Sequence, residues 1–430
     1  MKIVVICAAW LCLGMGLAIA DNETPGTPDS LSNAIPEYHN LVAGPGLPMG
    51  AGMENVITFN YLTETAIDRS INNHWFSEDR AVGKAGGVFC RLIKNIYVDM
   101  PLDYFSVVFS HEYFGHGARY RELWEDNIDY GYDAPPPYGG GGGHATAYIN
   151  DPITYDELMA IFVGGIETQA IINHKLNMRW MAQKEARYRE ASLYFWSFQI
   201  MYDYVRSTGD PLGEGRDDRD PAEYLYWLNT KAGVADLDNP AMRVSELKSR
   251  STINLVNPFL VFSIYSQLKT YLWDGNTVTS MPMIHVGHVG YLPALRLSLT
   301  PFGPQYHLEN YVRHGSRVTL VDLHLGDNTF YDSWGGVGLQ IQNAFQKDRL
   351  SLDIDCNAWK QPGVELTRNG SGVVGDGIGG AVAVTAHYDL SRVANPLTAA
   401  VQVGYKSAGF LEGHDLDASP IISIGFGYRH

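Results

Sequence analysis

From about Met283 to the end of the chain, apolar residues recur at every second position. Three of these runs place them at Val337, Leu339 and Ile341; at Leu350, Leu352, Ile354 and Cys356; and at Val382, Val384 and Ala386. A period of two is that of a β-strand, whose successive side chains point to opposite faces. The runs predict about eight or nine antiparallel strands joined by alternating tight and long connections.

The residues between these apolar positions are mainly Gly, Gln, Asp, Ser and Thr, with few Lys or Glu. A solvated sheet face usually carries more charge. The pattern resembles that of outer-membrane β-barrels, whose apolar face meets lipid. That resemblance implies a closed barrel of about eight strands over residues 281–430, in contact with outer-membrane lipid. The alternative is a soluble sandwich or barrel with its apolar face inside.

The first 20 residues have the pattern of a secretory signal peptide. Lys2 precedes an apolar run that ends in Ala18-Ile19-Ala20. We therefore expect export to the outer membrane or periplasm of a Gram-negative bacterium. Residues 21–54 are rich in Pro, Gly, Asn and Ser, which favours a flexible leader. Beyond the signal only Cys90 and Cys356 remain, and we expect two unpaired thiols.

The charge balance excludes one class of partner. The formal net charge is −16, and a nucleic-acid-binding protein needs a basic surface. We expect no nucleic-acid partner.

Residues 55–280 predict a mainly helical domain, so the whole chain is expected to be α+β. Within it lies the sequence His111-Glu112-Tyr-Phe-Gly-His116, which has the form H-E-x-x-x-H. Two imidazoles beside a carboxylate are the ligand-and-base set of zinc hydrolases. Random strings of this kind are common, so a helix that merely happens to be rich in His is the competing interpretation.

The spacing of the two histidines has a structural consequence. At about 100° per residue, positions i and i+5 of an α-helix point about 140° apart. A π-helical turn brings them to within about 50°, and such turns are concentrated at functional sites. We therefore predict a helix distorted near Gly115, with His111 and His116 as metal ligands and Glu112 as the general base. The alternative ligand pair is Glu112 and His116, which share one face of a regular helix.

A second helix is predicted from about Thr154 to Lys184. It contains Gly164-Gly165-Ile-Glu167 within an apolar stretch. A carboxylate in apolar surroundings must be paired, protonated or metal-bound, and Glu167 is the predicted third ligand. Its alternative is an ion pair. The two glycines would allow another helix to approach closely. His174 lies on the same face and is expected to support the site or simply to pack.

Several other residues are candidates for contact with a substrate or transition state. The loop Ala134–His144 contains five consecutive glycines and is either a lid carrying His144 or a surface loop. The segment from His144 could form an edge strand that pairs with an extended peptide. His144, Tyr148 and Arg119 are candidate donors to an oxyanion. For Arg119 we favour an ion pair with Glu122.

The His111–His116 motif followed by the Glu167 helix resembles the gluzincin-type zinc metallopeptidases, from which it departs in the longer His–His spacing. That longer spacing is itself similar to the motif of the modulator-of-gyrase type of metallopeptidase. The gluzincin resemblance implies a Zn²⁺-dependent hydrolase, expected to be a peptidase acting on peptide or protein substrates. Glu112 would take a proton from a water activated by the metal and return it to the leaving amine. The alternatives are a metal hydrolase of other amides and a non-catalytic surface protein with a structural metal site.

Overall fold

The computed structural model describes residues 37–71, 83–123, 127–149, 152–211, 217–233, 240–367, 372–374, 377–390 and 397–429. The predicted signal peptide, residues 1–20, lies outside these ranges, as do residues 21–36 of the predicted leader. The rest of that leader is ordered. It forms strand β1 (Tyr38–Ala43) and the first residues of helix α2 (Met49–Ile71).

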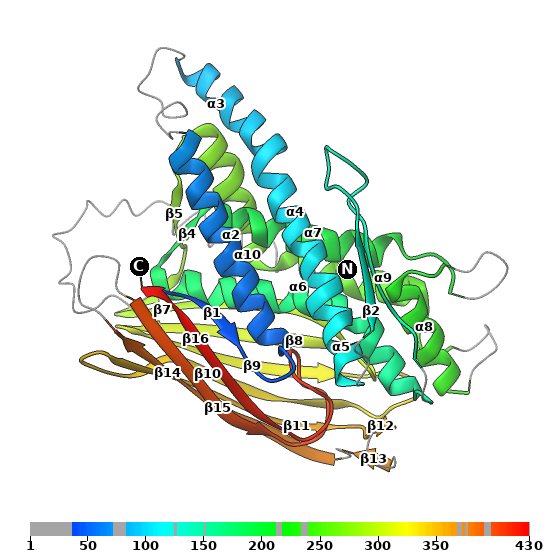
Figure 1. The fold of residues 1–430 in the computed structure, drawn as a ribbon. Helices are drawn as coiled ribbons and strands as arrows, with labels where there is room; N and C mark the ends of the chain where they lie inside the picture. The colour runs from blue at the N-terminus through cyan, green and yellow to red at the C-terminus, as the bar shows by residue number, and fades with distance from the viewer. Residues whose placement is uncertain are drawn as a thin grey trace.

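The described chain forms a large sheet with a layer of helices on one side (Figure 1). This confirms the α+β class and the C-terminal antiparallel sheet. The long strands after the helices are β7 (Val289–Thr300), β8 (Gly303–His314), β9 (Arg317–Gly326), β10 (Trp334–Lys347), β11 (Leu350–Gln361), β14 (Gly377–Asp389), β15 (Leu397–Lys406) and β16 (Ser419–Arg429). Shorter strands are β2 (Ile128–Tyr132), β3 (Gly143–Ala147), β4 (Glu185–Arg187), β5 (Val278–Ser280), β6 (Ile284–Val286), β12 (Val364–Leu366) and β13 (Gly372–Val374).

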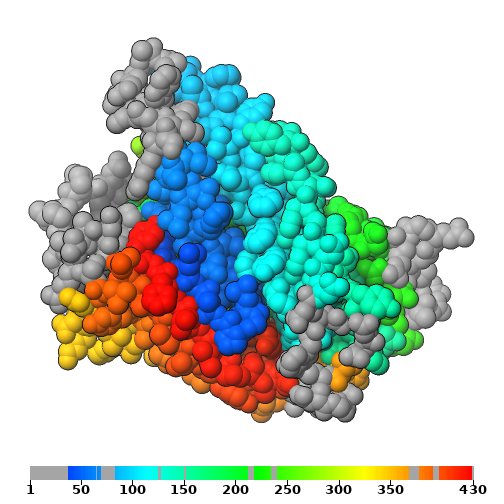
Figure 2. Space-filling view, in the orientation of Figure 1, coloured from blue at the N-terminus to red at the C-terminus, as the bar shows by residue number. Residues whose placement is uncertain are grey.

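The predicted closed barrel is not found. The strand order is β1-β16-β15-β14-β11-β10-β9-β8-β7-β6 in one 10-stranded sheet, and in the described residues its two ends do not pair with each other. All neighbours are antiparallel. Strand β1 comes from the predicted leader and pairs with the C-terminal strand β16, so the two ends of the described chain lie side by side (Figure 2).

Helices close the two edges of the sheet instead. At one edge, Asn55 of α2 accepts a hydrogen bond from Val42 N at 2.6 Å and donates one to Val42 O at 2.8 Å. At the other end, the short strand β6 pairs only with residues 289–291 of β7. Beyond it, Asn254 of η5 accepts a hydrogen bond from Leu297 N of β7 at 2.6 Å and donates one to Leu297 O at 3.3 Å. An edge strand leaves backbone groups unpaired, and a side-chain amide can satisfy one donor and one acceptor at once. The sheet therefore needs no strand-to-strand closure at these points.

The helical layer is built around α6 (Tyr155–Gln183), which lies along the sheet and contacts β7, β8 and β9. Its start agrees with the predicted helix, because Thr154 and Glu157 form a reciprocal capping box. The other helices are α3 (Gly83–Lys94), η3 (Asn95–Asp99), α4 (Met100–Phe109), η4 (Ser110–His116), α5 (Gly117–Glu122), α7 (Tyr188–Ser207), α8 (Asp220–Lys231), α9 (Val244–Ser251), η5 (Thr252–Val256), α10 (Pro258–Tyr265) and η6 (Ser266–Trp273). No described helix combines the length and apolar character needed to cross a membrane.

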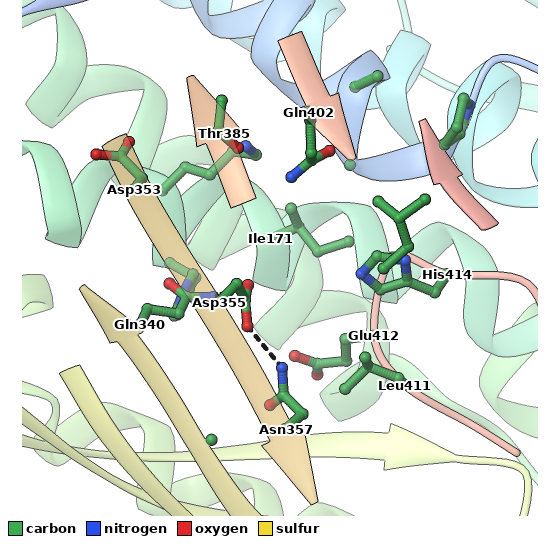
Figure 3. Close-up of a pocket in the computed structure, with 18 of the residues that line it drawn as sticks. Ile171, Gln340, Asp353, Asp355, Asn357, Thr385, Gln402, Leu411, Glu412 and His414 are labelled. Atoms are coloured by element: carbon green, nitrogen blue, oxygen red, sulfur yellow. Dashed lines mark hydrogen bonds between the residues drawn. The ribbon is translucent and has the colours of Figure 1, made fainter. Parts of the chain in front are cut away.

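The two faces of the sheet differ in chemistry. Along β15, Val401, Val403 and Tyr405 point outward and are 46%, 55% and 56% exposed, whereas Gln402 lines the interior. The interior between α6 and β10–β15 is a cavity of about 760 Å³, into which Asp353, Asp355 and Gln402 project (Figure 3). The main apolar core lies between the helices and the β7–β9 end of the sheet. In β14–β16 the polar face is thus inside and the apolar face outside, the reverse of the predicted soluble alternative.

Both cysteines of the described chain, Cys90 and Cys356, are free thiols, as expected from the sequence.

Candidate metal centre

The predicted π-helical turn is present. Residues Ser110–His116 form η4, a π-helix, and Gly117 N donates to Glu112 O five residues earlier. This winding brings the His111 and His116 rings to 4.8 Å between centroids, at an interplanar angle of 72°. Both imidazoles are buried. The π-helical winding therefore accommodates the extra residue in H-E-x-x-x-H, and the two histidines share one face of the helix.

Glycines allow η4 to approach α6 backbone to backbone. A Cβ atom on Gly115 would lie 2.6 Å from Gly165 Cα, and one on Gly165 would lie 2.3 Å from His111 Nε2. Only a residue without a side chain fits at either position. The close approach predicted for Gly164 and Gly165 is thus found, and its partner is the turn that carries the two histidines.

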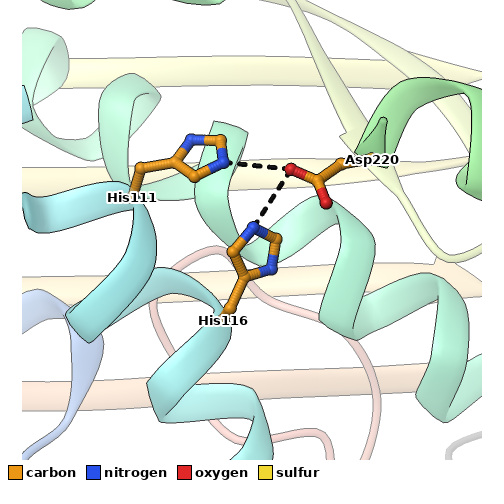
Figure 4. A group of neighbouring side chains, drawn as sticks. All are labelled: His111, His116 and Asp220. Atoms are coloured by element: carbon orange, nitrogen blue, oxygen red, sulfur yellow. Dashed lines mark hydrogen bonds and ion pairs between the residues drawn. The ribbon is translucent and has the colours of Figure 1, made fainter. Parts of the chain in front are cut away.

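The carboxylate that meets the two histidines is that of Asp220, the first residue of α8. Its Oδ2 atom lies 3.0 Å from His111 Nε2 and 3.1 Å from His116 Nε2 (Figure 4). Ligands of a tetrahedral zinc ion at about 2.0–2.2 Å from the metal are about 3.3 Å apart. The two distances to Asp220 are close to this spacing, and all three ligand atoms lie within 4.8 Å of one another. Tyr204 of α7 donates a hydrogen bond to Asp220 Oδ2 at 3.1 Å.

The partners of His116 also fit a cation at this point. Its Nδ1 atom lies 2.8 Å from Ile161 O, so Nδ1 carries a proton and Nε2 faces Asp220. A lone pair facing a carboxylate is repelled unless a proton or a metal ion lies between them. Burial lowers the pKa of His116, but Asp220 outweighs this and raises it to about 9. Burial likewise opposes ionisation of Asp220, but the histidines hold the pKa of its carboxyl well below the ordinary value.

Glu112 lies beside this group without belonging to it. The three ligand atoms that lie together are those of His111, His116 and Asp220, which favours the His–His pair over the alternative pair of Glu112 and His116. A Cβ atom on Gly143 of β3 would lie 3.0 Å from Glu112 Oε1, so the β2–β3 hairpin passes directly over this carboxylate. Burial, followed by the charges of Asp220 and Glu112, raises the pKa of Tyr120 to about 12.

The structure places Glu167 elsewhere, which corrects the predicted third ligand. Both Glu167 oxygens accept hydrogen bonds from Arg119 Nη2, at 2.8 and 2.7 Å, and Gly413 N donates to Oε1 at 2.6 Å. This is the ion pair named above as the alternative. Arg119 also binds Glu122 at 3.0 Å, as favoured from the sequence, and the carbonyl of His414. With its guanidinium committed in this way, Arg119 is not positioned as an oxyanion donor.

The remaining candidates do not approach the two histidines. His144 is more than half exposed, pairs with Asp129 at 3.8 Å and covers Gly131 on the hairpin. Tyr148 is also exposed. His174 lies against the sheet, 3.4 Å from Glu309 Oε1 and 2.9 Å from Gln340 Oε1. The segment after His144 does form an edge strand, β3, which pairs with β2.

Sequence reasoning missed Asp220 and Tyr204. The available signal for Asp220 was a carboxylate directly before Pro221, since proline is common at the first position of a helix. An acid at a helix start has an ordinary explanation in the helix dipole, so the position alone did not indicate a ligand. Tyr204 lies in an aromatic helical stripe, a pattern that ordinarily indicates core packing.

Comparison with protein-family models, with curated proteins and with solved structures finds no match for this chain.

Proposed function

We propose that this protein is a metal-dependent hydrolase, with Zn²⁺ held by His111, His116 and Asp220 and with Glu112 as the general base. The observation that supports the proposal is the convergence of two imidazole Nε2 atoms on one carboxylate oxygen, with Glu112 on the same π-helical turn. Two histidines and one carboxylate also bind Fe²⁺. The adjacent carboxylate favours hydrolysis, because a hydrolase needs a base beside its metal-activated water.

In this proposal each residue has a chemical role. A bound zinc ion supplies Lewis acidity, which lowers the pKa of a water toward 7 and polarises a carbonyl group. Glu112 accepts the proton of the attacking water and delivers it to the leaving group. Ile161 O fixes the tautomer of His116 through Nδ1. Tyr204 donates its hydroxyl proton in a hydrogen bond to Asp220 and so orients that carboxylate.

A peptide is the proposed substrate class. Strand β3 pairs with β2 along one edge and passes over Glu112. An extended peptide could add to its other edge and so present a carbonyl group to the metal. Other amides, and a structural metal site without catalysis, are the competing functions.

The proposed location is the outer membrane of a Gram-negative bacterium, with the outer face of the sheet against lipid. Its support is the outward apolar face of β14–β16, whose Ile424 and Phe426 are 51% and 63% exposed, together with the polar interior. This is the arrangement of residues in a membrane barrel. Here helices would complete the wall that strands complete in a barrel.

The decisive experiment compares Glu112→Gln with Asp220→Asn in zinc content and in hydrolysis of an unstructured protein such as casein. Glu112→Gln should retain about one zinc at this centre and lose activity by about 10²–10⁴-fold, the usual contribution of general acid–base catalysis. Asp220→Asn should lose both metal and activity. Glu167→Gln is the matched control and should keep its metal. Unchanged activity in Glu112→Gln would favour the structural metal site.

A further inference from the structure

The cavity between α6 and the sheet has an excess of negative charge. It has a volume of about 760 Å³, and among the described residues it is lined by eight carboxylate side chains and four lysine or arginine side chains. None of His111, His116 and Asp220 lines it. The cavity is therefore separate from the centre described above, and its chemistry favours a cationic ligand.

Two adjacent strands bring a second group of ligand atoms together at the wall of this cavity. His307 of β8 and His324 of β9 are directly opposite each other in the register, and Asp322 precedes His324 by two residues on the same face. Asp322 Oδ2 lies 2.8 Å from His307 Nδ1 and 3.4 Å from His324 Nδ1. These spacings bracket the value of about 3.3 Å expected between ligands of one tetrahedral ion.

The three side chains are held by their surroundings, and two of their polar atoms lack a hydrogen-bond partner among the described residues. His307 Nε2 lies 2.9 Å from Ser298 Oγ, which fixes the ring. A Cβ atom on Gly336 would lie 2.6 Å from His324 Nε2, so this glycine provides the space that the second ring occupies. Asp322 Oδ1 and His324 Nδ1 are buried and have no hydrogen-bond partner in the described part of the chain. An unpaired buried polar atom requires a partner such as a bound water or an ion, and here two of them belong to one group of potential metal ligands.

The neighbouring charges are consistent with a divalent ion. Arg296 is a neighbouring cation, and its Nη2 lies 3.3 Å from His307 Nδ1. Its own charge is matched by Glu309, at 2.8 Å, and by Glu412, whose two oxygens are each 2.8 Å away. The three carboxylates of Asp322, Glu309 and Glu412 outnumber this one arginine by two, and His174, 3.4 Å from Glu309, also faces this group. A cation beside Asp322 would offset the excess of carboxylates.

We propose that His307, Asp322 and His324 form a second metal site, which takes a divalent transition ion such as Zn²⁺ and presents it to the cavity. Two histidines and a carboxylate are a complete protein ligand set for such an ion and leave at least one coordination position open. The three ligands line the cavity, so a neutral donor molecule in the cavity would complete the coordination.

The test is metal stoichiometry, measured by mass spectrometry after equilibration of the full chain with Zn²⁺ and removal of excess. The wild type should bind about two ions per chain. Asp322→Asn and His324→Gln should each bind one, with the affinity of the lost ion reduced at least about 100-fold. His116→Gln should also bind one. The matched control is His387→Gln, because His387 also meets an aspartate in this cavity, Asp353 at 3.1 Å, but has no second imidazole; it should keep both ions.

The outcomes separate this inference from the proposed function. The second site would be overturned if Asp322→Asn and His324→Gln both still bind two ions. It would also be overturned if the wild type binds one ion and only His116→Gln loses it. If the wild type binds one ion and only Asp322→Asn and His324→Gln lose it, the second site is supported and the catalytic metal centre is overturned. If these variants do not fold, carbethoxylation of wild-type histidines decides the question. Zn²⁺ should protect His307 and His324 but not His387, and equal labelling of His307 and His324 with and without zinc would contradict the site.

Discussion

The two nitrogens of His116 face different acceptors, and this makes its protonation a direct competitor of the metal. Nδ1 donates to Ile161 O, and Nε2 faces Asp220. Without metal the raised pKa of about 9 keeps the ring cationic at pH 7. Metal binding must release that proton, so zinc affinity should rise about tenfold per pH unit up to about pH 9. A chelator-competition titration between pH 6.5 and 9.5 measures this slope.

The same proton makes the stability of the metal-free protein depend on pH. The pKa of His116 is raised from 6.5 to about 9 on folding. Its stabilisation is therefore fully present below about pH 6.5 and is lost as pH rises through about 9. We expect the free energy of unfolding to fall by about 2–3 kcal/mol over this window, measured by urea denaturation with a chelator present. Asp220→Asn should largely remove the fall, and a wild-type stability that is flat or rises over the window would contradict the assignment.

Substitution of Gly165 tests whether the packing of α6 against η4 holds the histidines in place. A Cβ atom there would lie 2.3 Å from His111 Nε2, so Gly165→Ala should displace the imidazole and lower zinc affinity by at least about tenfold. Gly50→Ala in α2 is the control, because its Cβ has no neighbour closer than 4.0 Å. The measurement is zinc affinity beside thermal unfolding. A Gly165→Ala protein with wild-type affinity would show that His111 is not positioned by this contact.

Local spacing made part of the centre predictable, whereas its third ligand required the tertiary fold. His111 and His116 are five residues apart, so helix geometry alone indicated the π-helical turn that the structure contains. Asp220 reaches them across a sequence separation of 109 residues from His111, and no local periodicity encodes such a contact. Glu167 was chosen because a carboxylate in an apolar stretch needs a partner. That reasoning was sound, but the partner is Arg119 rather than a metal.

At the scale of elements, the edges of the sheet show why strand patterns did not predict closure. Period-two alternation identifies strands and their faces, and it located β10, β11 and β14. It carries no information on which groups hydrogen-bond to the unpaired backbone N–H and C=O of an edge strand. Here Asn55 and Asn254, both in helical segments, provide these partners. Each hydrogen-bonds to the backbone N–H and C=O of one residue at the edge. The strand β1 was missed because its short sequence lies in a stretch rich in turn-forming residues.

These two asparagines make a matched pair of tests. Asn254→Ala should leave the N–H and C=O of buried Leu297 without partners, with a loss of about 2–4 kcal/mol in the free energy of unfolding. Asn55→Ala should be less damaging, because Val42 is only partly buried and water can replace the amide there. Chemical denaturation of both variants measures the difference. Equal and small losses, below about 0.5 kcal/mol, would mean that the asparagines do not seal the edges.

At the scale of the whole molecule, the distribution of polarity is inverted in one half of the sheet. The carboxylates and amides of β10–β15 project into the cavity (Figure 3), while valine, isoleucine and aromatic side chains of β14–β16 face outward. A water-soluble sheet would gain free energy from the opposite arrangement, since apolar surface is stabilised by removal from water. An environment of lipid would make the observed arrangement favourable. The outer apolar side chains would then be removed from water, and the inner polar side chains would stay hydrated in the cavity.

Substitutions at neighbouring positions of β15 test this environment directly. Val403 points outward and Gln402 inward, so Val403→Lys would place a charge in lipid at a penalty of up to about 2–4 kcal/mol. Gln402→Lys would place the same charge in an acidic cavity and should be tolerated. Both proteins would be refolded into phospholipid vesicles, and the inserted fraction measured by flotation and by protease protection. We expect wild type and Gln402→Lys to insert and Val403→Lys to insert poorly. If all three remain soluble without detergent and none floats with the vesicles, the outward apolar face does not meet lipid, and a protein partner must cover it instead.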